Sequence, residues 1–222
     1  MKSVSRLVSP LVKLILGAVC TVDGRELEKL PRTGPLIVVI NHINFLEVPL
    51  LYTYLYPRDL VGMVKRETWD NPIIGALAWA WDAISLDRES TDLTAMRKAG
   101  EALRAGRILA MAPEGTRSGH GRLQRGRAGI VMLARRENAT IVPVAHYGGE
   151  RFWENLRSFR KTRFVFKVGE SFKLRPPAPG EGRRGREEAT DEIMRRLARL
   201  LPPEYRGAYA DDSEEERHLL FG

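Results

Sequence analysis

His42 is followed five positions later by Glu47, and a histidine close to a carboxylate is a common arrangement for moving protons in enzymes. A carboxylate that accepts a hydrogen bond from the imidazole orients the ring, fixes its tautomer and stabilises its charged form. The pair therefore suggests a general base acting on a hydroxyl group. The same spacing also fits a polar turn in which His42 is bonded to the backbone. The motif alone leaves both interpretations open.

Arg88 is a candidate for binding an anionic group of a substrate. It follows a short apolar stretch at 83–86, and a planar guanidinium binds phosphate through two hydrogen bonds. The alternative is an ion pair between Arg88 and one of its neighbours, Asp87 or Glu89.

A second candidate site for an anion is a polar turn further along the chain. The turn consists of Glu114, Gly115, Thr116, Arg117 and Ser118. It combines a carboxylate, a glycine that permits close backbone approach and a guanidinium. The glycine- and arginine-rich stretch 121–129 continues it and suits a flexible anion-binding loop, although a solvated turn has the same composition.

Each of these motifs comes directly after a predicted strand. The run Leu36–Ile40 is continuously apolar, rich in β-branched residues and bounded by Gly34 and Pro35, which is typical of a strand buried on both faces. Further strands are expected at 60–64, 83–86, 107–111, 140–145 and 163–168, and helices at 46–56, 71–80, 127–136, 187–201 and after a cap at Ser90 or Thr91. Pro143 is expected to mark a sheet edge or a bulge.

This alternation predicts an α/β fold: a single domain with a largely parallel, mixed central sheet flanked by helices, plus an N-terminal apolar helix. The ends of parallel strands share one edge of a sheet, so His42, Arg88 and Arg117 are expected to converge there. We assign residues 22–174 to the catalytic domain, 175–186 to a Pro/Gly/Arg-rich linker, and 187–222 to a C-terminal amphipathic helix and an acidic tail.

Residues 1–21 are predicted to form an apolar or interfacial helix. Ser9 and Pro10 suit an N-cap and a first helical position, which favours a helix from there to just before Asp23. An earlier start would place Pro10 inside the helix. Such a helix, with basic residues beside an apolar surface, suits contact with a membrane surface, although it would equally suit a cover for the core. A signal peptide is the other interpretation, but no clear cleavage site follows.

Composition limits the classes of partner. The chain has 222 residues, 43% of them hydrophobic, and a net charge of +8, with a pI near 9.9. The charge implies an anionic partner: nucleic acid, lipid headgroups or a phosphorylated substrate. A single cysteine, Cys20, excludes an intramolecular disulfide and a cysteine-rich zinc site. A nucleic-acid-binding module is disfavoured because the arginines cluster at strand ends and in the linker, without interleaved aromatic residues.

Four ordered motifs together resemble the glycerophospholipid acyltransferases, the family of 1-acyl-glycerol-3-phosphate acyltransferases. The motifs are Asn41-His42 with Glu47, the block from Lys65 to Arg88, the turn from Glu114 to Ser118, and Val142-Pro143-Val144. The resemblance covers about residues 22–168. The family's first motif usually carries aspartate where this chain has Glu47, whose extra methylene changes its reach.

The resemblance implies transfer of a fatty acyl group from an acyl thioester to the hydroxyl of a lyso-glycerophospholipid. The acceptor expected is 1-acyl-glycerol-3-phosphate, giving phosphatidate in phospholipid biosynthesis. Alternatives are glycerol 3-phosphate, lyso-ornithine lipid, or a catalytically silent lipid-binding relative. The donor would be acyl-CoA or acyl carrier protein, with no metal and no other cofactor.

The same resemblance assigns roles to residues. His42 would be the base and Glu47 its partner, while Arg117, assisted by Arg88, would bind the acceptor's phosphate. The rest of the turn, Glu114, Gly115 and Thr116, would contribute to the acceptor pocket. The apolar helix at 71–80 would line an acyl-chain slot or simply pack in the core, and tryptophans 69, 79 and 81 are candidates for a membrane interface. The implied location is cytoplasmic, peripherally associated with the inner face of the cell membrane.

Overall fold

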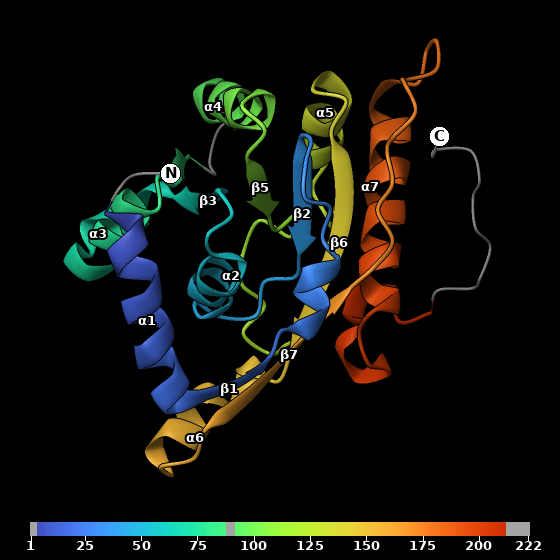
Figure 1. Ribbon diagram of the computed structural model, residues 1–222. Coiled ribbons are helices and arrows are strands. Elements are labelled where there is room, and N and C mark those ends of the chain that lie inside the picture. Colours follow the sequence, from blue (N-terminus) through green and yellow to red (C-terminus); the bar gives the residue numbers. More distant parts are fainter. Residues whose placement is uncertain (1–3, 88–91, 212–222) are drawn as a thin grey trace.

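The computed structural model describes residues 4–87 and 92–211 (Figure 1). These residues form a seven-stranded sheet with the order β1-β7-β6-β2-β5-β3-β4. The strands are β1 Cys20–Asp23, β2 Leu36–Ile40, β3 Leu60–Lys65, β4 Ile84–Leu86, β5 Ile108–Met111, β6 Thr140–Tyr147 and β7 Thr162–Val168. All neighbouring pairs are parallel except β6 and β7, which are antiparallel. The predicted α/β class with a largely parallel, mixed sheet is confirmed.

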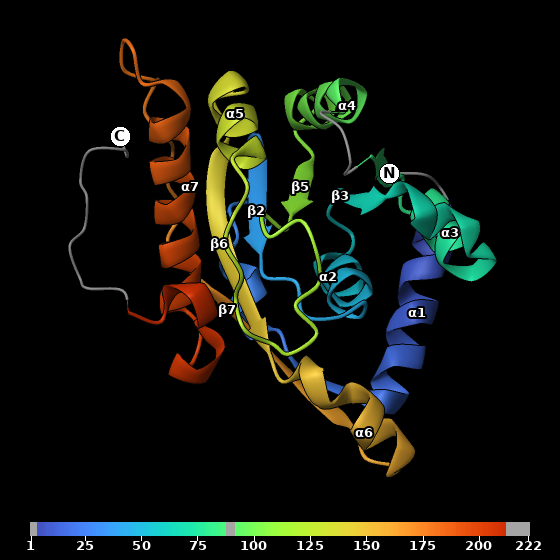
Figure 2. The same cartoon turned by 180° about the vertical axis from the view of Figure 1, so that it is seen from behind.

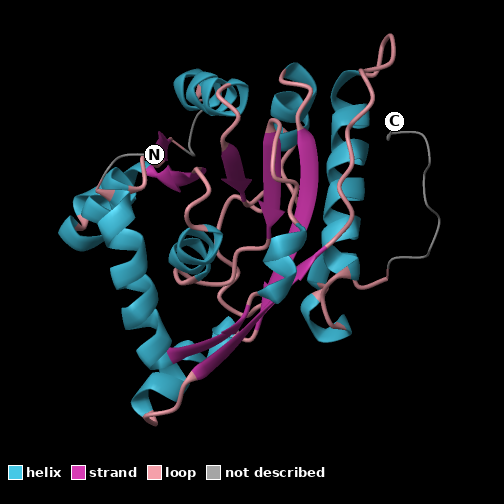
Figure 3. Ribbon diagram, in the orientation of Figure 1, coloured by secondary structure: helices cyan, strands magenta, loops and turns pink. Residues whose placement is uncertain are grey.

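Helices cover both faces of this sheet (Figures 2 and 3). They are α1 Ser5–Val19, α2 Glu47–Leu55, α3 Pro72–Ala80, α4 Leu93–Arg104, α5 Gly129–Arg136, α6 Phe152–Arg157 and α7 Gly182–Arg199. Short 3₁₀ turns lie at η1 Arg25–Lys29, η2 Arg66–Asp70, η3 Gly149–Arg151, η4 Pro203–Tyr205 and η5 Gly207–Tyr209. One apolar cluster joins α4, α5 and α7 to one face, and another joins α1, α2 and α6 to the opposite face.

The central strand β2 explains why the first motif sits where it does. All five of its residues are buried, with Ile37 and Val39 in one cluster and Leu36, Val38 and Ile40 in the other. A strand that contributes to two apolar cores must be continuously hydrophobic, as its sequence is. Because β2 runs parallel to β5 and β6, Asn41 and His42 lie at the edge of the sheet where those two strands also end.

The predicted start of the N-terminal helix at Ser9 is wrong. Helix α1 begins at Ser5, and Pro10 lies inside it. Ser5, Ser9 and Leu16 are the buried residues of α1, and the Ser9 hydroxyl accepts a hydrogen bond from Trp81 Nε1 at 3.1 Å. Ser9 therefore serves the packing of α1 rather than a cap, and that packing outweighs the backbone hydrogen bond lost at Pro10.

Two other helix starts also differ from prediction. Asp92, rather than Ser90 or Thr91, caps α4 by accepting from the Ala95 N–H at 2.8 Å; Ser90 and Thr91 themselves lie outside the described residues. Helix α7 begins at Gly182 instead of residue 187, inside the expected linker. The bidentate bond from Arg135 to Glu181, at 2.5 and 3.1 Å, holds the chain immediately before that helix.

Pro143 lies within β6, which has neighbours on both sides, so the sheet-edge alternative is wrong. The Gly169 N–H donates to the Pro143 carbonyl at 2.9 Å. Val144 of β6 pairs with Val168, and Ile141 of β6 pairs with Phe172. The segment 168–172 opposite β6 is therefore one residue longer than the segment 141–144 with which it pairs. The proline, which has no N–H to donate, therefore sits at a local irregularity of the pairing, as the bulge alternative predicted.

Candidate active site

His42 and Glu47 meet at the carboxyl end of β2. The His42 Nδ1 is hydrogen-bonded to Glu47 Oε1, and the side chains are 11% and 1% exposed. Since a carboxylate accepts, Nδ1 carries the hydrogen and Nε2 keeps a lone pair. The geometry is therefore that of an oriented imidazole able to take a proton at Nε2, rather than a ring bonded to the backbone.

The segment 41–47, which we call the His42 loop, is held by its own polar side chains. The second carboxylate oxygen of Glu47 accepts from the Asn44 N–H at 3.1 Å. Asn44 Oδ1 accepts from the Leu46 N–H at 2.8 Å, an Asx turn that leads the chain into α2. The buried Glu47 thus has a partner for each oxygen, which offsets the cost of burying its charge.

The loop is also bonded across the sheet to β6. Asn41 Nδ2 donates to the His146 carbonyl, and the His146 N–H donates to Asn41 Oδ1, each at 2.8 Å. The fully buried His146 ring completes the set with Nε2 at 2.8 Å from the Asn41 carbonyl. Burial lowers the pKa of His146 and favours the neutral ring. Sequence reasoning missed His146 because it ended the strand at Ala145, two residues short of the end of β6 at Tyr147.

Glu114 braces the His42 loop from a neighbouring strand end. Its side chain is 4% exposed; Oε1 accepts from the His42 N–H at 2.7 Å and Oε2 from the Gln124 N–H at 2.9 Å. Burial raises the pKa of Glu114, although the bonds from His42 and Gln124 act in the opposite direction. In this position the carboxylate holds the backbone that carries His42.

The segment 113–119, the Glu114 turn, lies directly against the His42 loop. Ser118 N–H donates to the His42 carbonyl at 2.8 Å, and Gly119 N–H donates to the Ile43 carbonyl at 3.1 Å. Gly115 has φ +73°, and a Cβ there would lie 2.8 Å from Arg127 Nε, so both backbone and space favour glycine. Thr116 and Arg117 are exposed beside these contacts. The structure brings this predicted turn to His42, while Arg88 lies outside the described residues.

We predict that Glu114→Gln lowers the stability of the fold and the activity together. A glutamine has one acceptor oxygen for two backbone N–H groups, so its amide nitrogen would face a donor. Leaving such a buried donor unmatched costs on the order of 1–3 kcal/mol. Urea denaturation measures the change, and Glu67→Gln, at a side chain that is 60% exposed, is the matched control. An unchanged free energy of unfolding would contradict the bracing role.

The apolar helix α3 is not simply part of the core. Ile73 and Trp79 are 73% and 55% exposed, whereas Trp81, just after the helix, is 5% exposed. Trp81 stacks on Tyr52 with ring centroids 4.5 Å apart. Plain core packing is therefore wrong for Ile73 and Trp79, and a membrane-interface position is wrong for Trp81.

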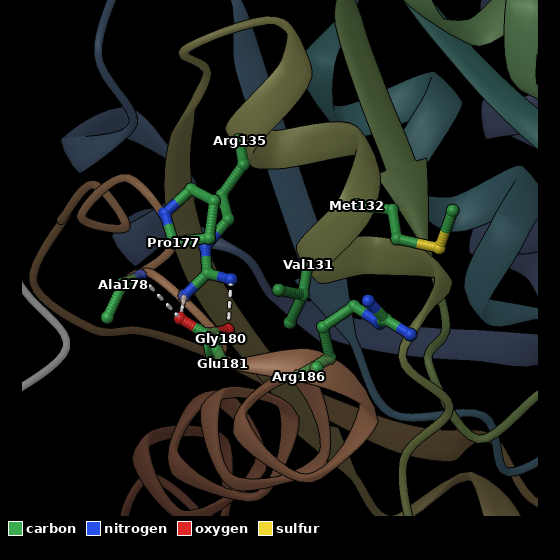
Figure 4. Close-up of a pocket in the computed structure, with 9 residues that line it drawn as sticks. Val131, Met132, Arg135, Pro177, Ala178, Gly180, Glu181 and Arg186 are labelled. Atoms are coloured by element: carbon green, nitrogen blue, oxygen red, sulfur yellow. Dashed lines mark hydrogen bonds and ion pairs between the residues drawn. The ribbon is translucent and has the colours of Figure 1, made fainter.

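A cavity of about 400 Å³ lies away from His42, between α5 and the start of α7 (Figure 4). The Arg135–Glu181 pair projects along its wall, and none of the predicted site residues lines it. Within the described residues, no group of His, Cys, Asp and Glu is arranged to hold a metal ion. Over the same part of the chain, no helix has the length and apolar character needed to cross a membrane.

Comparisons with known proteins show which enzymes this chain is similar to. The 1-acyl-sn-glycerol-3-phosphate acyltransferase of Bacillus subtilis (strain 168) is 27% identical over 160 residues, which cover 72% of this chain and 77% of the relative. A protein of the same name from Limnanthes alba is 34% identical over 121 residues, covering 53% of this chain and 42% of the relative.

A solved structure shows the same fold. The 1-acyl-sn-glycerophosphate acyltransferase PlsC from Thermotoga maritima superposes with a TM-score of 0.61 at 22% identity, covering 84% of this chain and 76% of that chain. The model of the Acyltransferase family matches residues 21–147, more than half of the sequence. That match includes the His42 loop, the Glu114 turn and Pro143, and the chain belongs to the Acyltransferase family.

Proposed function

We propose that this protein transfers a fatty acyl group from an acyl thioester to the free hydroxyl of 1-acyl-glycerol-3-phosphate, producing phosphatidate. The observation that carries the proposal is the buried His42–Glu47 pair at the carboxyl end of β2, in a chain of this family. The relatives from Bacillus subtilis and Limnanthes alba are named for this activity.

The reaction follows from the orientation of the imidazole. An alcohol is a weak nucleophile until a base removes its proton, and we assign that step to His42 Nε2. The oxygen then attacks the thioester carbonyl, the tetrahedral intermediate collapses, and the thiol leaves with the proton returned from His42. Glu47 holds the ring and stabilises its charge while it carries that proton.

Direct transfer needs no acyl-enzyme intermediate. Cys20 is buried in β1, and burial raises the pKa of its thiol to about 11, which keeps the thiolate scarce at neutral pH. We therefore assign the nucleophile to the acceptor itself, with acyl-CoA or acyl carrier protein as the donor and no metal or other cofactor.

We predict that Arg117→Lys raises the KM for lysophosphatidate about tenfold or more, because lysine keeps the charge but loses the two-pronged geometry that guanidinium offers to phosphate. The KM for the acyl donor should change little, and Arg88→Lys should act in the same direction more weakly. Steady-state kinetics with each substrate varied in turn measures this. A selective rise in the donor KM would instead assign these arginines to the donor's phosphates.

The proposed function is tested by incubating purified protein with labelled acyl-CoA or acyl carrier protein and a panel of acceptors. The panel contains lysophosphatidate, glycerol 3-phosphate and lyso-ornithine lipid, and the lipid products are then resolved. Labelled phosphatidate as the main product supports the proposal. Preference for another acceptor would reassign the substrate, and no transfer to any acceptor would leave a lipid-binding relative without activity.

We further propose that the protein associates peripherally with the inner face of the cell membrane through α1. Four apolar side chains of this helix face solvent: Leu7, Leu11, Leu14 and Ile15, 58–77% exposed. Removing all residues before Val22 would also remove the buried Leu16 and the Ser9–Trp81 hydrogen bond. Substitutions on the exposed face of α1 are therefore the cleaner test.

We predict that Leu7→Ser, Leu11→Ser and Leu14→Ser combined weaken binding to anionic liposomes by more than tenfold. Each substitution removes the free energy gained when a leucine side chain moves from water into the bilayer. Co-sedimentation measures the change, and Leu93→Ser on α4, where the side chain is 73% exposed, is the matched control. Equal sedimentation of parent and triple variant would show that α1 is not the membrane contact.

A further inference from the structure

Helix α6 and the turn after it present large apolar side chains to solvent. Phe159 is 101% exposed, Trp153 is 55% exposed and Leu156 is 37% exposed. We call residues 152–161 the α6 tip. Phe159 has φ +53°, a conformation that bulky residues rarely adopt. Nothing in the described part of the chain covers this ring, so its packing within the protein does not account for it.

The same segment carries a net positive charge. The α6 tip contains three basic side chains, Arg157, Arg160 and Lys161, and one acid, Glu154. Glu154 is already bonded to Arg151, at 2.6 and 3.0 Å. An anionic lipid surface has negative headgroups above apolar acyl chains. The basic residues match the headgroups, and the tryptophan and the fully exposed phenylalanine match the apolar layer beneath them.

The α6 tip lies beside the C-terminal end of α1. Lys161 Nζ donates to the Gly17 carbonyl near the end of α1 at 2.7 Å, and both views show α6 beside that end of the helix (Figures 1 and 2). Leu14 and Ile15 lie within one turn of Gly17 and are 74% and 58% exposed. Exposed apolar side chains on two neighbouring elements suit a bilayer better than a small protein partner.

The α6 tip also touches the His42 loop. Phe45, which lies between His42 and Glu47, packs against Phe152 and Trp153 with ring centroids 5.9 and 5.7 Å apart. Asn44 Nδ2 donates to the carbonyl of Gly149, in the turn that leads into α6, at 2.6 Å. The segment that exposes Phe159 is therefore joined to the loop that carries the candidate base.

We infer that the α6 tip is a second contact with the surface of an anionic bilayer, and that it places the His42 loop against acceptor lipid within that bilayer. The contact itself rests on exposure and charge, whereas the placement of acceptor rests on the proposed function. Phe159 inserts among the acyl chains, and Arg157 and Arg160 pair with headgroup phosphates.

The test compares the parent with Phe159→Asn and with Arg157→Gln/Arg160→Gln. Asparagine tolerates a positive φ, so the first variant keeps the turn. Leu93→Ser, on the distant α4, is the matched control for loss of an exposed apolar side chain. Binding is measured by co-sedimentation with phosphatidylglycerol and phosphatidylcholine vesicles. Activity is measured with lysophosphatidate embedded in vesicles and with a short-chain, freely dissolved analogue.

Phe159→Asn should weaken binding to phosphatidylglycerol vesicles about tenfold, and the double arginine variant should do so about tenfold or more at low salt. Both should lose activity on embedded acceptor and stay within about twofold of the parent on the dissolved analogue. The control variant should match the parent in both measurements.

Unchanged vesicle binding in both variants overturns the inference. A rise in the KM for acyl carrier protein, with vesicle binding intact, also overturns the inference. That result would mean that the α6 tip is a docking site for that acidic protein. Equal loss on both acceptors would mean that Phe159 acts through the His42 loop rather than through lipid. Weakened binding in a protein without acyltransferase activity would refute the proposed function and leave the lipid contact standing.

Discussion

Replacing His42 by alanine is expected to lower kcat by a factor of roughly 100 to 10,000, the usual contribution of a positioned general base. The loss should appear with every acceptor, because deprotonation of the hydroxyl is common to all of them. The fold should survive, since the ring lies in the loop after β2 rather than in either apolar cluster, and the buried Glu47 keeps its bond from Asn44.

His42→Gln sharpens this experiment. Its side-chain amide can still donate to Glu47, so the buried carboxylate is not left without its second partner, but the amide cannot accept a proton. Labelled product per unit time is measured for both variants, with circular dichroism and urea denaturation to establish folding. Near-normal turnover in either folded variant would exclude His42 as the base and leave the reaction to another group.

The part of the site that could be predicted from sequence lies within one stretch of chain. The apolar run Leu36–Ile40 predicts a buried strand, and the chain then turns into α2, whose first residue is Glu47. A residue in the first turn of a helix lies close to the loop that precedes it. His42 and Glu47 could therefore be paired without knowing the rest of the fold.

The contacts that hold this pair could not be predicted in the same way. Glu114 reaches the backbone of His42 from 72 positions away, and Asn41 reaches His146 from 105 positions away. Bonds from side chains to a distant backbone leave no periodic pattern in the sequence. The resemblance assigns Glu114 to the acceptor pocket, whereas in the structure its oxygens accept from the backbone N–H groups of His42 and Gln124.

The errors at helix boundaries have a common cause in tertiary packing. Ser9 and Pro10 have the local preferences of a helix start, yet α1 begins at Ser5 because its buried face packs on the core. Residues ahead of α7 look like a linker, but the Arg135–Glu181 pair fixes them to α5. Local propensity is worth a few tenths of a kcal/mol to about 1 kcal/mol for most residues and about 3 kcal/mol for a proline inside a helix. The packing of α1 therefore has to outweigh the larger of these costs, at Pro10.

Replacing Glu47 by glutamine is expected to reduce kcat about as strongly as loss of the base, by up to about 10,000-fold, as when the carboxylate of a histidine-based triad is neutralised. The side chain keeps its volume, but the amide cannot stabilise an imidazolium. Its nitrogen would face a donor, either the Asn44 N–H or His42 Nδ1–H. If the ring changes tautomer to relieve that clash, the hydrogen moves to Nε2 and the base is lost.

Glu47→Asp provides the matched control, because it keeps the charge and shortens the side chain by one methylene. In this chain the glutamate spans from the first turn of α2 to both His42 and Asn44, so aspartate should restore part of the activity rather than all of it. The kcat is expected to fall from the parent to Glu47→Asp and again to Glu47→Gln. The KM for the acyl donor should change by less than about threefold in both variants, because the carboxylate acts on the ring and not on bound substrate. Activity in Glu47→Gln within tenfold of the parent would show that this carboxylate only braces the loop, and that His42 is oriented by another group.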